Sequence, residues 1–268
     1  MRRLFFFDLD GTLLDTQKQI GKKTYDALCA WHEAGHVIAI SSGRPLASIL
    51  SVIESQGLLP FSPYAVAANG TQIYDCTAGK DLYRCTLSMP EVRTLYGLAQ
   101  NEGLYLHTYG GGEIYTASEG EELAFYTRVV RLPHHLLPSF PEGLPEEPCK
   151  MLAIDLAESG KLMRFSEAVE KDLPGRISCV LSNPWYLEIF SAEAGKGAAV
   201  ARLASLLGID ASATLAAGDA ENDVSMIRAA AVGIAMCNGQ DGAIAAADRI
   251  TDSDNDHDGL AVLIREYI

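Results

Sequence analysis

Basic residues are scarce in this chain of 268 residues. Lys and Arg together number 21, against 35 Asp and Glu, which gives a formal net charge of -14. A surface with this charge repels the phosphates of nucleic acids and anionic lipid headgroups, so we expect neither nucleic acid nor membrane as a partner. Such a chain can still bind one phosphate group, provided that a cation, a lysine or a few backbone amides converge on it.

Cysteines are few and widely spaced, and long apolar runs are absent from the sequence. The six cysteines form no Cys-x-x-Cys pair, which is typical of reduced thiols rather than of a disulfide framework. Asp8 and Asp10 interrupt the first apolar run too early for a signal peptide. No stretch approaches the ~18 apolar residues that suggest a membrane span. We therefore expect a cytoplasmic protein, either a monomer or a small homo-oligomer.

The two ends of the chain show the same alternation of short apolar runs and helical stretches. Apolar residues make up 48% of the chain, which is typical of a globular protein, and the length suits a core with a second module. The alternation predicts a doubly wound, Rossmann-like α/β core with a parallel sheet. Its strands are expected at Leu4–Leu9, Val37–Ile40, Tyr64–Ala68, Thr214–Ala217 and Val232–Ala235.

The middle third of the chain follows a different pattern and reads as an inserted α+β module. The Pro-rich stretch from Pro133 to Pro148 is expected to be a loop. We place the core at residues 1–80 and 188–268 and the inserted module at residues 81–187. Its expected helices are Pro90–Asn101, Glu121–Val130 and Gly160–Leu173, and its expected strands are Leu104–Thr108, Glu113–Thr116, Met151–Leu156, Ile177–Leu181 and Trp185–Phe190.

Asp8 and Asp10 come at the end of the first expected strand. In open α/β sheets the carboxyl ends of the strands open into the ligand crevice, and residues two apart on a strand point the same way. Two carboxylates that converge repel each other and need a cation or a proton between them. Gly11 allows a tight turn and Thr12 adds a hydroxyl. The alternative interpretation of this motif is an acidic turn that caps a helix.

A second acidic group follows a later strand, in Gly218-Asp219-Ala220-Glu221-Asn222-Asp223. Together with the first motif, Asp219 would form a site rich in oxygen and free of Cys and His, which favours magnesium over zinc. Acidic residues in the first turn of a helix are also common as caps, and we assign Glu221 to that role. A third acidic stretch, Asp252 to Asp258, is interpreted as a solvated loop, because it lacks the glycine and terminal glutamate of a calcium loop.

Two further elements could bind phosphate. Lys196 lies between two glycines at the expected start of a helix, where a lysine is unfavourable for the helix dipole and therefore suggests an anionic partner. Ser42 and Gly43 follow the second strand and offer a hydroxyl and an amide. Each element also has a plain structural interpretation, as a surface lysine and as a common Ser-Gly turn.

The four elements, in this order, resemble the haloacid dehalogenase-like hydrolase superfamily. Asp8-Leu9-Asp10-Gly11-Thr12 is similar to its first motif, Ser42 to the second, Lys196 to the third and Gly218-Asp219 with Asn222-Asp223 to the fourth. The position of the insertion resembles a C2B cap, and Ser42-Gly43-Arg44-Pro45, Asn69-Gly70 and Gly233 to Asn238 resemble the Cof-type branch. Ala220, Cys237 and Ser42 depart from the commonest residues of these motifs without removing a reactive group.

The resemblance implies a magnesium-dependent phosphatase that hydrolyses small phosphomonoesters, such as a sugar phosphate, through an aspartyl-phosphate. It implies Asp8 as the nucleophile and Asp10 as the general acid and base, with Ser42 and Lys196 completing the catalytic set. Magnesium would be held by Asp8, the backbone carbonyl of Asp10, and Asp219, while Asp223 would orient this group from behind. The phosphate would be bound by Gly11, Ser42, Gly43, Lys196 and Asn222.

Two other functions stay open on the sequence alone. One is a sugar phosphomutase similar to phosphomannomutases, which would need cap arginines to hold a second phosphate. The other is a phospho-acceptor regulatory protein similar to a receiver domain, which also uses strand-end aspartates, magnesium and a lysine. Receiver domains do not have an acid two residues after the phosphorylated aspartate, where this chain has Asp10. The cap is also rich in His, Tyr and Arg, including His107, Tyr109, Tyr126, Arg128, His134 and His135, and we expect each of these to be packed or solvated rather than a ligand.

Overall fold

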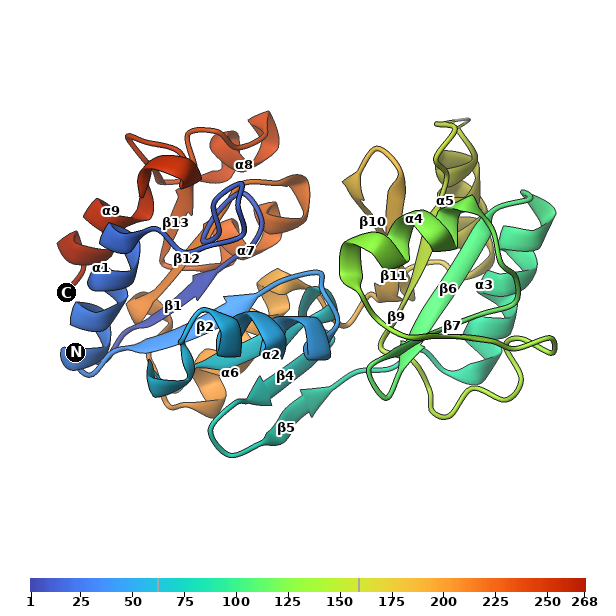
Figure 1. The fold of residues 1–268 in the computed structure, drawn as a ribbon, viewed down its shortest axis with the longest axis horizontal. Coiled ribbons are helices and arrows are strands. Elements are labelled where there is room, and N and C mark those ends of the chain that lie inside the picture. The colour runs from blue at the N-terminus through green and yellow to red at the C-terminus, as the bar shows by residue number, and fades with distance from the viewer. Residues whose placement is uncertain (62, 159) are drawn as a thin grey trace. The chain divides into compact units, whose positions relative to one another are not determined.

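The computed structural model describes residues 1–61, 63–158 and 160–268, and within them the chain forms two compact units. The first unit joins Met1–Tyr83 to Gly195–Ile268, and the second comprises Arg84–Ala194 (Figure 1). The predicted boundary at 187/188 falls inside strand β11 (Tyr186–Ser191), whereas the units divide between Ala194 and Gly195. The two strands that follow Asn69-Gly70, Gln72–Asp75 and Lys80–Arg84, belong to the sheet of the first unit.

The first unit is built on a sheet of eight strands in the order β14-β13-β12-β1-β2-β3-β4-β5. Pairing is parallel from β14 to β3, and β4 is antiparallel to β3. This confirms the predicted α/β class with a parallel core. The strands are β1 (Leu4–Phe7), β2 (Val37–Ser41), β3 (Tyr64–Ala67), β4 (Gln72–Asp75), β5 (Lys80–Arg84), β12 (Thr214–Gly218), β13 (Val232–Ala235) and β14 (Arg249–Ile250).

Helices cover both faces of this sheet because β1 is apolar on both sides. Phe5 and Phe7 pack into one hydrophobic cluster with residues of α1, α2 and α9, while Leu4 and Phe6 pack into another with residues of α6 and α7. The helices are α1 (Lys22–Glu33), α2 (Leu46–Ser55), α6 (Lys196–Leu206), α7 (Val224–Ala229), α8 (Asp241–Ala246) and α9 (Leu260–Glu266).

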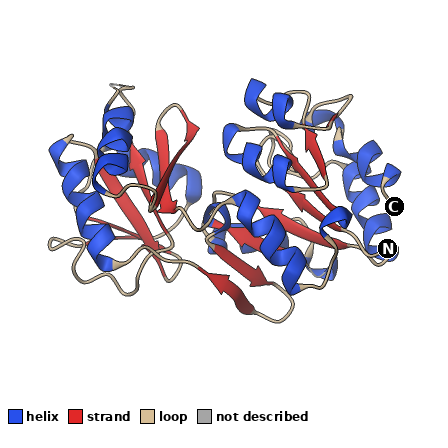
Figure 2. Ribbon diagram, turned by 180° about the vertical axis from the view of Figure 1, so that it is seen from behind, coloured by secondary structure: helices blue, strands red, loops and turns tan. Residues whose placement is uncertain are grey.

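The second unit has a six-stranded sheet in the order β10-β11-β9-β6-β7-β8. Helices α3 and α5 pack on one face of it and α4 on the other (Figure 2). The prediction of a loop from Pro133 to Pro148 is wrong at its start, because β8 (His134–Leu136) pairs with β7. The other elements are β6 (Tyr105–Gly110), β7 (Glu113–Thr116), β9 (Lys150–Ile154), β10 (Ile177–Asn183), α3 (Met89–Asn101), α4 (Glu121–Val130) and α5 (Lys161–Asp172).

The central strands of the first unit end at the same level. Phe7 at the end of β1 pairs with Ile40 of β2 and with Ala217 of β12. The residues that follow these strands therefore meet at one edge of the sheet, as the carboxyl ends of parallel strands do. Among the described residues, no helix is both long enough and apolar enough to cross a membrane.

Candidate active site

Asp8 lies at the carboxyl edge of the sheet, directly after the last residue of β1. Its amide donates to the carbonyl oxygen of Ala217 at 2.9 Å, which extends the pairing of β1 with β12 by one residue. The Asp8 side chain is buried, and its Oδ1 accepts a hydrogen bond from Lys196 Nζ at 2.6 Å. The first residue after the strand is thus fixed by its backbone and by a charged partner.

Lys196 is a buried cation at the first turn of α6. It is 2% exposed, and its Nζ also donates to Oδ1 of Asp223 at 2.5 Å. Asp223 is fully buried, and its Oδ2 accepts from the amides of Asp219 and Ala220, both at 3.1 Å. The alternative of a surface lysine is wrong, because a lysine in this position is held by two carboxylates that offset the unfavourable helix dipole.

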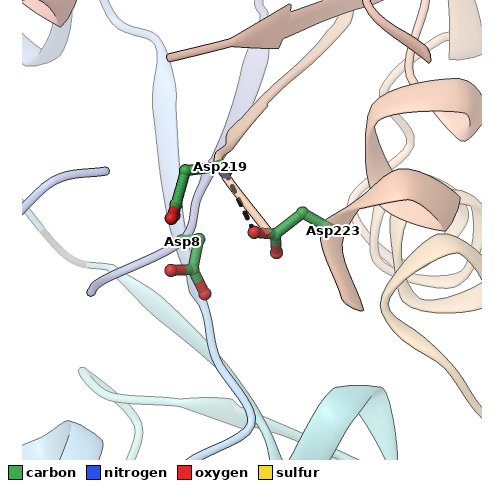
Figure 3. A group of neighbouring side chains, drawn as sticks. All are labelled: Asp8, Asp219 and Asp223. Carbon is green, nitrogen blue, oxygen red and sulfur yellow. Dashed lines mark hydrogen bonds between the residues drawn. The ribbon is translucent and has the colours of Figure 1, made fainter. Parts of the chain in front are cut away.

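Asp219 completes a group of three carboxylates. Figure 3 shows Asp8, Asp219 and Asp223 together, with the bond from the Asp219 amide to the Asp223 carboxylate drawn as a dashed line. Oδ1 of Asp219 accepts from the Thr12 hydroxyl at 2.8 Å. Gly11 has φ 84°, and a Cβ there would lie 2.5 Å from Asp219 Oδ2. Glycine is therefore required at position 11 both by the turn and by this close approach.

The three carboxylates hold more negative charge than Lys196 can balance. Burial, followed by the charge of Asp223, raises the pKa of Asp8 well above its ordinary value, although Lys196 opposes this. Burial also raises the pKa of Asp219 to about 6, against the hydrogen bond from Thr12. For Lys196, burial would lower the pKa, but the charges of Asp223 and Asp8 raise it. The balance of charge calls for a further cation.

The donor set fits a divalent metal ion. One ligand atom from each of Asp8, Asp219 and Asp223 lies within 4.8 Å of the others, and all three atoms are carboxylate oxygens. Oxygen-only donor sets are those that hard cations prefer. Both oxygens of Asp223 already accept hydrogen bonds from Lys196 and two amides, so this residue braces Lys196 and the start of the Asp219 turn.

Asp10 lies at the same edge, but its carboxylate has other partners. Its two oxygens accept from Arg44 Nε at 2.8 Å and from Arg44 Nη2 at 2.6 Å, and Lys18 Nζ adds a third bond at 2.7 Å. Burial by itself would raise the Asp10 pKa, but the bonds and charges of Arg44 and then Lys18 lower it overall. Asp8 and Asp10 thus lie at the same edge of the sheet, but their carboxylates bind different cations. Asp8 binds Lys196, and Asp10 binds Arg44 and Lys18.

The other predicted phosphate-binding residues surround this edge. Ser42 is buried directly after β2, and its Oγ accepts from the amide of Arg44 at 3.2 Å. Gly43 lies between these two residues in the same turn. Asn222 is half-buried in the short turn Glu221–Asp223 that follows β12. Their roles toward a phosphate stay predictions.

Comparison with known proteins identifies the architecture that carries this site. A family model described as haloacid dehalogenase-like hydrolase matches residues 5–264. The chain belongs to this family. The family assignment made from the motifs is confirmed, and the enzyme is a hydrolase of the haloacid dehalogenase-like type.

Individual relatives agree with the family match along the whole chain. A haloacid dehalogenase-like hydrolase from Bacteroides thetaiotaomicron is 28% identical, with full coverage of both chains and a TM-score of 0.88. The 5-amino-6-(5-phospho-D-ribitylamino)uracil phosphatase YcsE of Bacillus subtilis is 26% identical over 99% of this chain and 96% of its own. The subclass IIB sugar phosphatase BT4131 shares the fold, with a TM-score of 0.84, 22% identity, and coverage of 99% and 98%.

Three residues of this hydrolase site were not assigned from the sequence. Arg44 and Lys18 bind the Asp10 carboxylate, and Asn238 donates from Nδ2 to the carbonyl of Gly11 at 3.1 Å. Arg44 stands next to Ser42-Gly43 in the second motif, and Asn238 ends the segment that resembles the Cof-type branch, so motif membership could have suggested both. Lys18 is an exposed lysine in a turn, and nothing in the sequence distinguishes it.

Proposed function

We propose that the protein is a magnesium-dependent phosphatase that hydrolyses small phosphomonoesters through an aspartyl-phosphate on Asp8. The observation that carries the proposal is the group of three carboxylates around one buried lysine at the carboxyl edge of the sheet. A site with this excess of negative charge is suited to a divalent cation and, with it, to the phosphate of a substrate. The phosphatase names of its relatives support the same class of reaction.

In the first half-reaction Asp8 attacks phosphorus. Lys196 holds Oδ1, so we assign the attack to Oδ2, which forms the new O–P bond while the bond from phosphorus to the ester oxygen breaks. Two unit charges ~4 Å apart repel by ~4 kcal/mol at an effective dielectric of ~20, so an anionic nucleophile meets an anionic ester at a cost of ~10³ in rate without compensation. Lys196 provides part of this compensation.

The remaining compensation belongs to the metal. A bound magnesium ion, held by Asp8, the carbonyl of Asp10 and Asp219, would neutralise the phosphate oxygens and align them with the nucleophile. Ser42, the amide of Gly43, Gly11 and Asn222 are the residues of this chain that we assign to the phosphate oxygens. Asp223 keeps Lys196 and the start of the Asp219 turn in place.

Asp10 is assigned to the proton transfers. It would give a proton to the departing ester oxygen and then take one from the water that attacks the aspartyl-phosphate, which releases inorganic phosphate and restores Asp8. Its lowered pKa and its three bonds to Arg44 and Lys18 suit the second of these steps, since a base must be ionised. As an acid, it would have to leave some of these bonds first.

The substrate class that we propose is a small phosphorylated metabolite, a sugar phosphate or a compound of similar size. The name of YcsE gives a phosphoribitylamino compound and the name of BT4131 gives a sugar phosphate as the substrate class. We extend these classes to this chain as a proposal, to be tested by measuring inorganic phosphate released from a panel of phosphomonoesters.

A phosphomutase is less well supported. Such an enzyme needs arginines that can hold a second phosphate, and four arginines of the second unit are bound to glutamates in the same unit. These pairs are Arg84–Glu146, Arg93–Glu142, Arg164–Glu102 and Arg176–Glu91. Phosphate transfer to a sugar phosphate with a bisphosphate activator, and no net release of phosphate, would favour the mutase.

The proposal is tested by Asp8→Asn. The variant removes the attacking oxygen charge with almost no change of volume, and we expect magnesium-dependent release of phosphate from an aryl phosphate to disappear. An acid-quenched phosphoprotein should form in the wild type and be absent from the variant. Asp26→Asn is the matched control, because Asp26 is an exposed aspartate of α1 paired with Lys22. Activity retained by Asp8→Asn would refute the assignment of the nucleophile.

A further inference from the structure

The turn after the Asp-x-Asp motif brings Lys18 to Asp10. Lys18 has φ 61° and lies in a turn in which the Asp15 amide donates to the Gln19 carbonyl at 2.8 Å. The side chains of Lys18 and Asp10 are 59% and 41% exposed, and an ion pair this exposed is too weak to order a turn by itself. Other contacts must therefore hold the segment in the position that lets Lys18 reach Asp10.

The acidic loop of residues 252–258 supplies two of these contacts before Lys18. Asn255 Nδ2 donates to the carbonyl of Leu14 at 2.8 Å, and Asp256 Oδ1 accepts from the amide of Thr16 at 2.7 Å. The bonded residues are some 240 positions apart in the chain. The loop, which the sequence suggested to be merely solvated, is thus attached to the segment that follows the catalytic motif.

Asp258 supplies a third contact after Lys18. Its Oδ1 accepts from the amide of Thr24 at 2.9 Å, in the first turn of α1, where Gly21 offers no side chain to cap the helix. A Cβ at Gly21 would lie 2.2 Å from Asp258 Oδ1, so a glycine is needed to let this carboxylate approach. A carboxylate at this point both caps the helix and favours its dipole. Residues 14–24 are therefore held at both ends.

The first anchor is also connected to Asp10 through the backbone. Leu14 forms an isolated β-bridge with Asp10, and the Leu14 amide donates to the Leu9 carbonyl at 2.8 Å. We propose that Asn255, Asp256 and Asp258 are positioning residues for the Asp10 carboxylate, which they orient by holding the turn that carries Lys18. This inference rests on the proposed role of Asp10 as the base that activates water.

Steady-state kinetics with para-nitrophenyl phosphate and magnesium test the inference. The leaving group of this ester needs little protonation, so kcat reports mainly on the water step in which Asp10 acts as a base. Asn255→Ala and Asp256→Ala should each lower kcat about tenfold and leave KM within about twofold, because each loses one anchoring hydrogen bond. Asp256→Asn, which keeps an acceptor oxygen for the Thr16 amide, should restore most of kcat.

Asp254→Ala is the matched control. It removes a carboxylate from the same loop, but this carboxylate bonds to His257 within the loop and its loss should leave kcat close to that of the wild type. A double-mutant cycle then separates positioning from general destabilisation. Lys18→Met should lower kcat by itself, and Asn255→Ala should have no further effect in that background. Independent, multiplicative effects would overturn the proposal.

Amide hydrogen exchange of residues 14–24 decides whether the loop holds the turn, even if no phosphatase activity is found. Exchange should become faster in Asn255→Ala and Asp256→Ala and stay unchanged in Asp254→Ala. Unchanged exchange in all three variants would overturn the inference by itself. An inactive wild type with faster exchange in the two anchor variants would instead refute the proposed function and leave the anchoring established.

Discussion

Each of the two units buries a lysine next to acidic side chains, and the two environments differ in their balance of charge. In the first unit Lys196 is surrounded by the carboxylates of Asp8, Asp219 and Asp223. In the second unit Lys150 forms an ion pair with Glu188, which also accepts from the Ser182 hydroxyl at 3.1 Å. Both lysines are 2% exposed, so burial by itself does not distinguish them.

The surroundings of Lys150 are polar but balanced. Next to the ion pair, His107 Nε2 bonds to the Tyr109 hydroxyl at 3.0 Å, and this hydroxyl bonds to that of Tyr126 at 2.5 Å. Burial, and then the charge of Lys150, lowers the His107 pKa to about 3, so this histidine is neutral at physiological pH. Here one buried lysine is matched by one buried carboxylate, whereas the three carboxylates of the first unit outnumber their one lysine. An excess of buried charge, more than burial itself, marks the functional site.

Removal of Lys196 should have the largest effect. Lys196→Met leaves Asp8 and Asp223 buried without their cation, and we expect kcat/KM for an aryl phosphate to fall by about 10³ because one compensating charge at the nucleophile is lost. Lys150→Met is the matched variant in the other unit and should retain kcat/KM within about threefold at a temperature where it is folded. Equal losses in the two variants would show that the charge balance does not separate the sites.

Lys150→Met should instead reduce stability. Breaking a buried ion pair leaves Glu188 charged without a partner, so the free energy of unfolding should fall by about 3–5 kcal/mol in urea titrations. The double variant Lys150→Met with Glu188→Met removes both charges and should recover most of this loss. If the double variant were as unstable as the single one, the pair would serve packing rather than charge balance.

Magnesium should stabilise the first unit, and Asp219 should be required. At a magnesium concentration 100 times the dissociation constant, the free energy of unfolding should rise by about 2.7 kcal/mol over that of protein stripped with a chelator. Asp219→Ala should abolish this increase, whereas Lys150→Met should keep it. A magnesium response that survives in Asp219→Ala would place the metal elsewhere.

The pH dependence of stability should depend on His107. Its pKa is about 3 when folded and near 6.5 when unfolded, so the unfolded chain takes up the proton first as the pH falls. The contribution of the neutral histidine to the free energy of unfolding is fully present above pH ~6.5. Below that pH it is lost progressively, by about 2 kcal/mol between pH 7 and pH 5. His107→Gln should remove this part of the pH dependence in urea titrations. His134→Gln, at an exposed histidine of the same unit, should leave it unchanged.

Much of the arrangement at the sheet edge of the first unit could be predicted from the sequence. The apolar runs before Asp8, Ser42 and Asp219 predict strands, and parallel strands present their following residues at a common edge. Lys196 could be assigned an anionic partner because it opposes the dipole of its own helix. These predictions succeed because strand period, chain direction and helix polarity are local properties that the order of residues already contains.

The partners of Asp10 could not be predicted in the same way. Its carboxylate binds Arg44 and Lys18, because β1 ends at Phe7 and the chain already turns at Leu9, so strand alternation no longer applies at Asp10. The boundary of the second unit and strand β8 were also decided by pairing between strands distant in sequence. A three-residue strand at the edge of a sheet leaves no periodic pattern to detect.

The sequence by itself determined the family, the α/β core and the set of carboxylates, lysine and serine at the end of the sheet. Only the tertiary structure decided which cation pairs with which carboxylate. Lys196 binds Asp8 and Asp223, and Arg44 binds Asp10. It also attached the loop of residues 252–258 to the turn that carries Lys18. The physical reason is that such contacts join groups that are between 27 and 241 residues apart in the chain, and no local propensity encodes a partner at such distances.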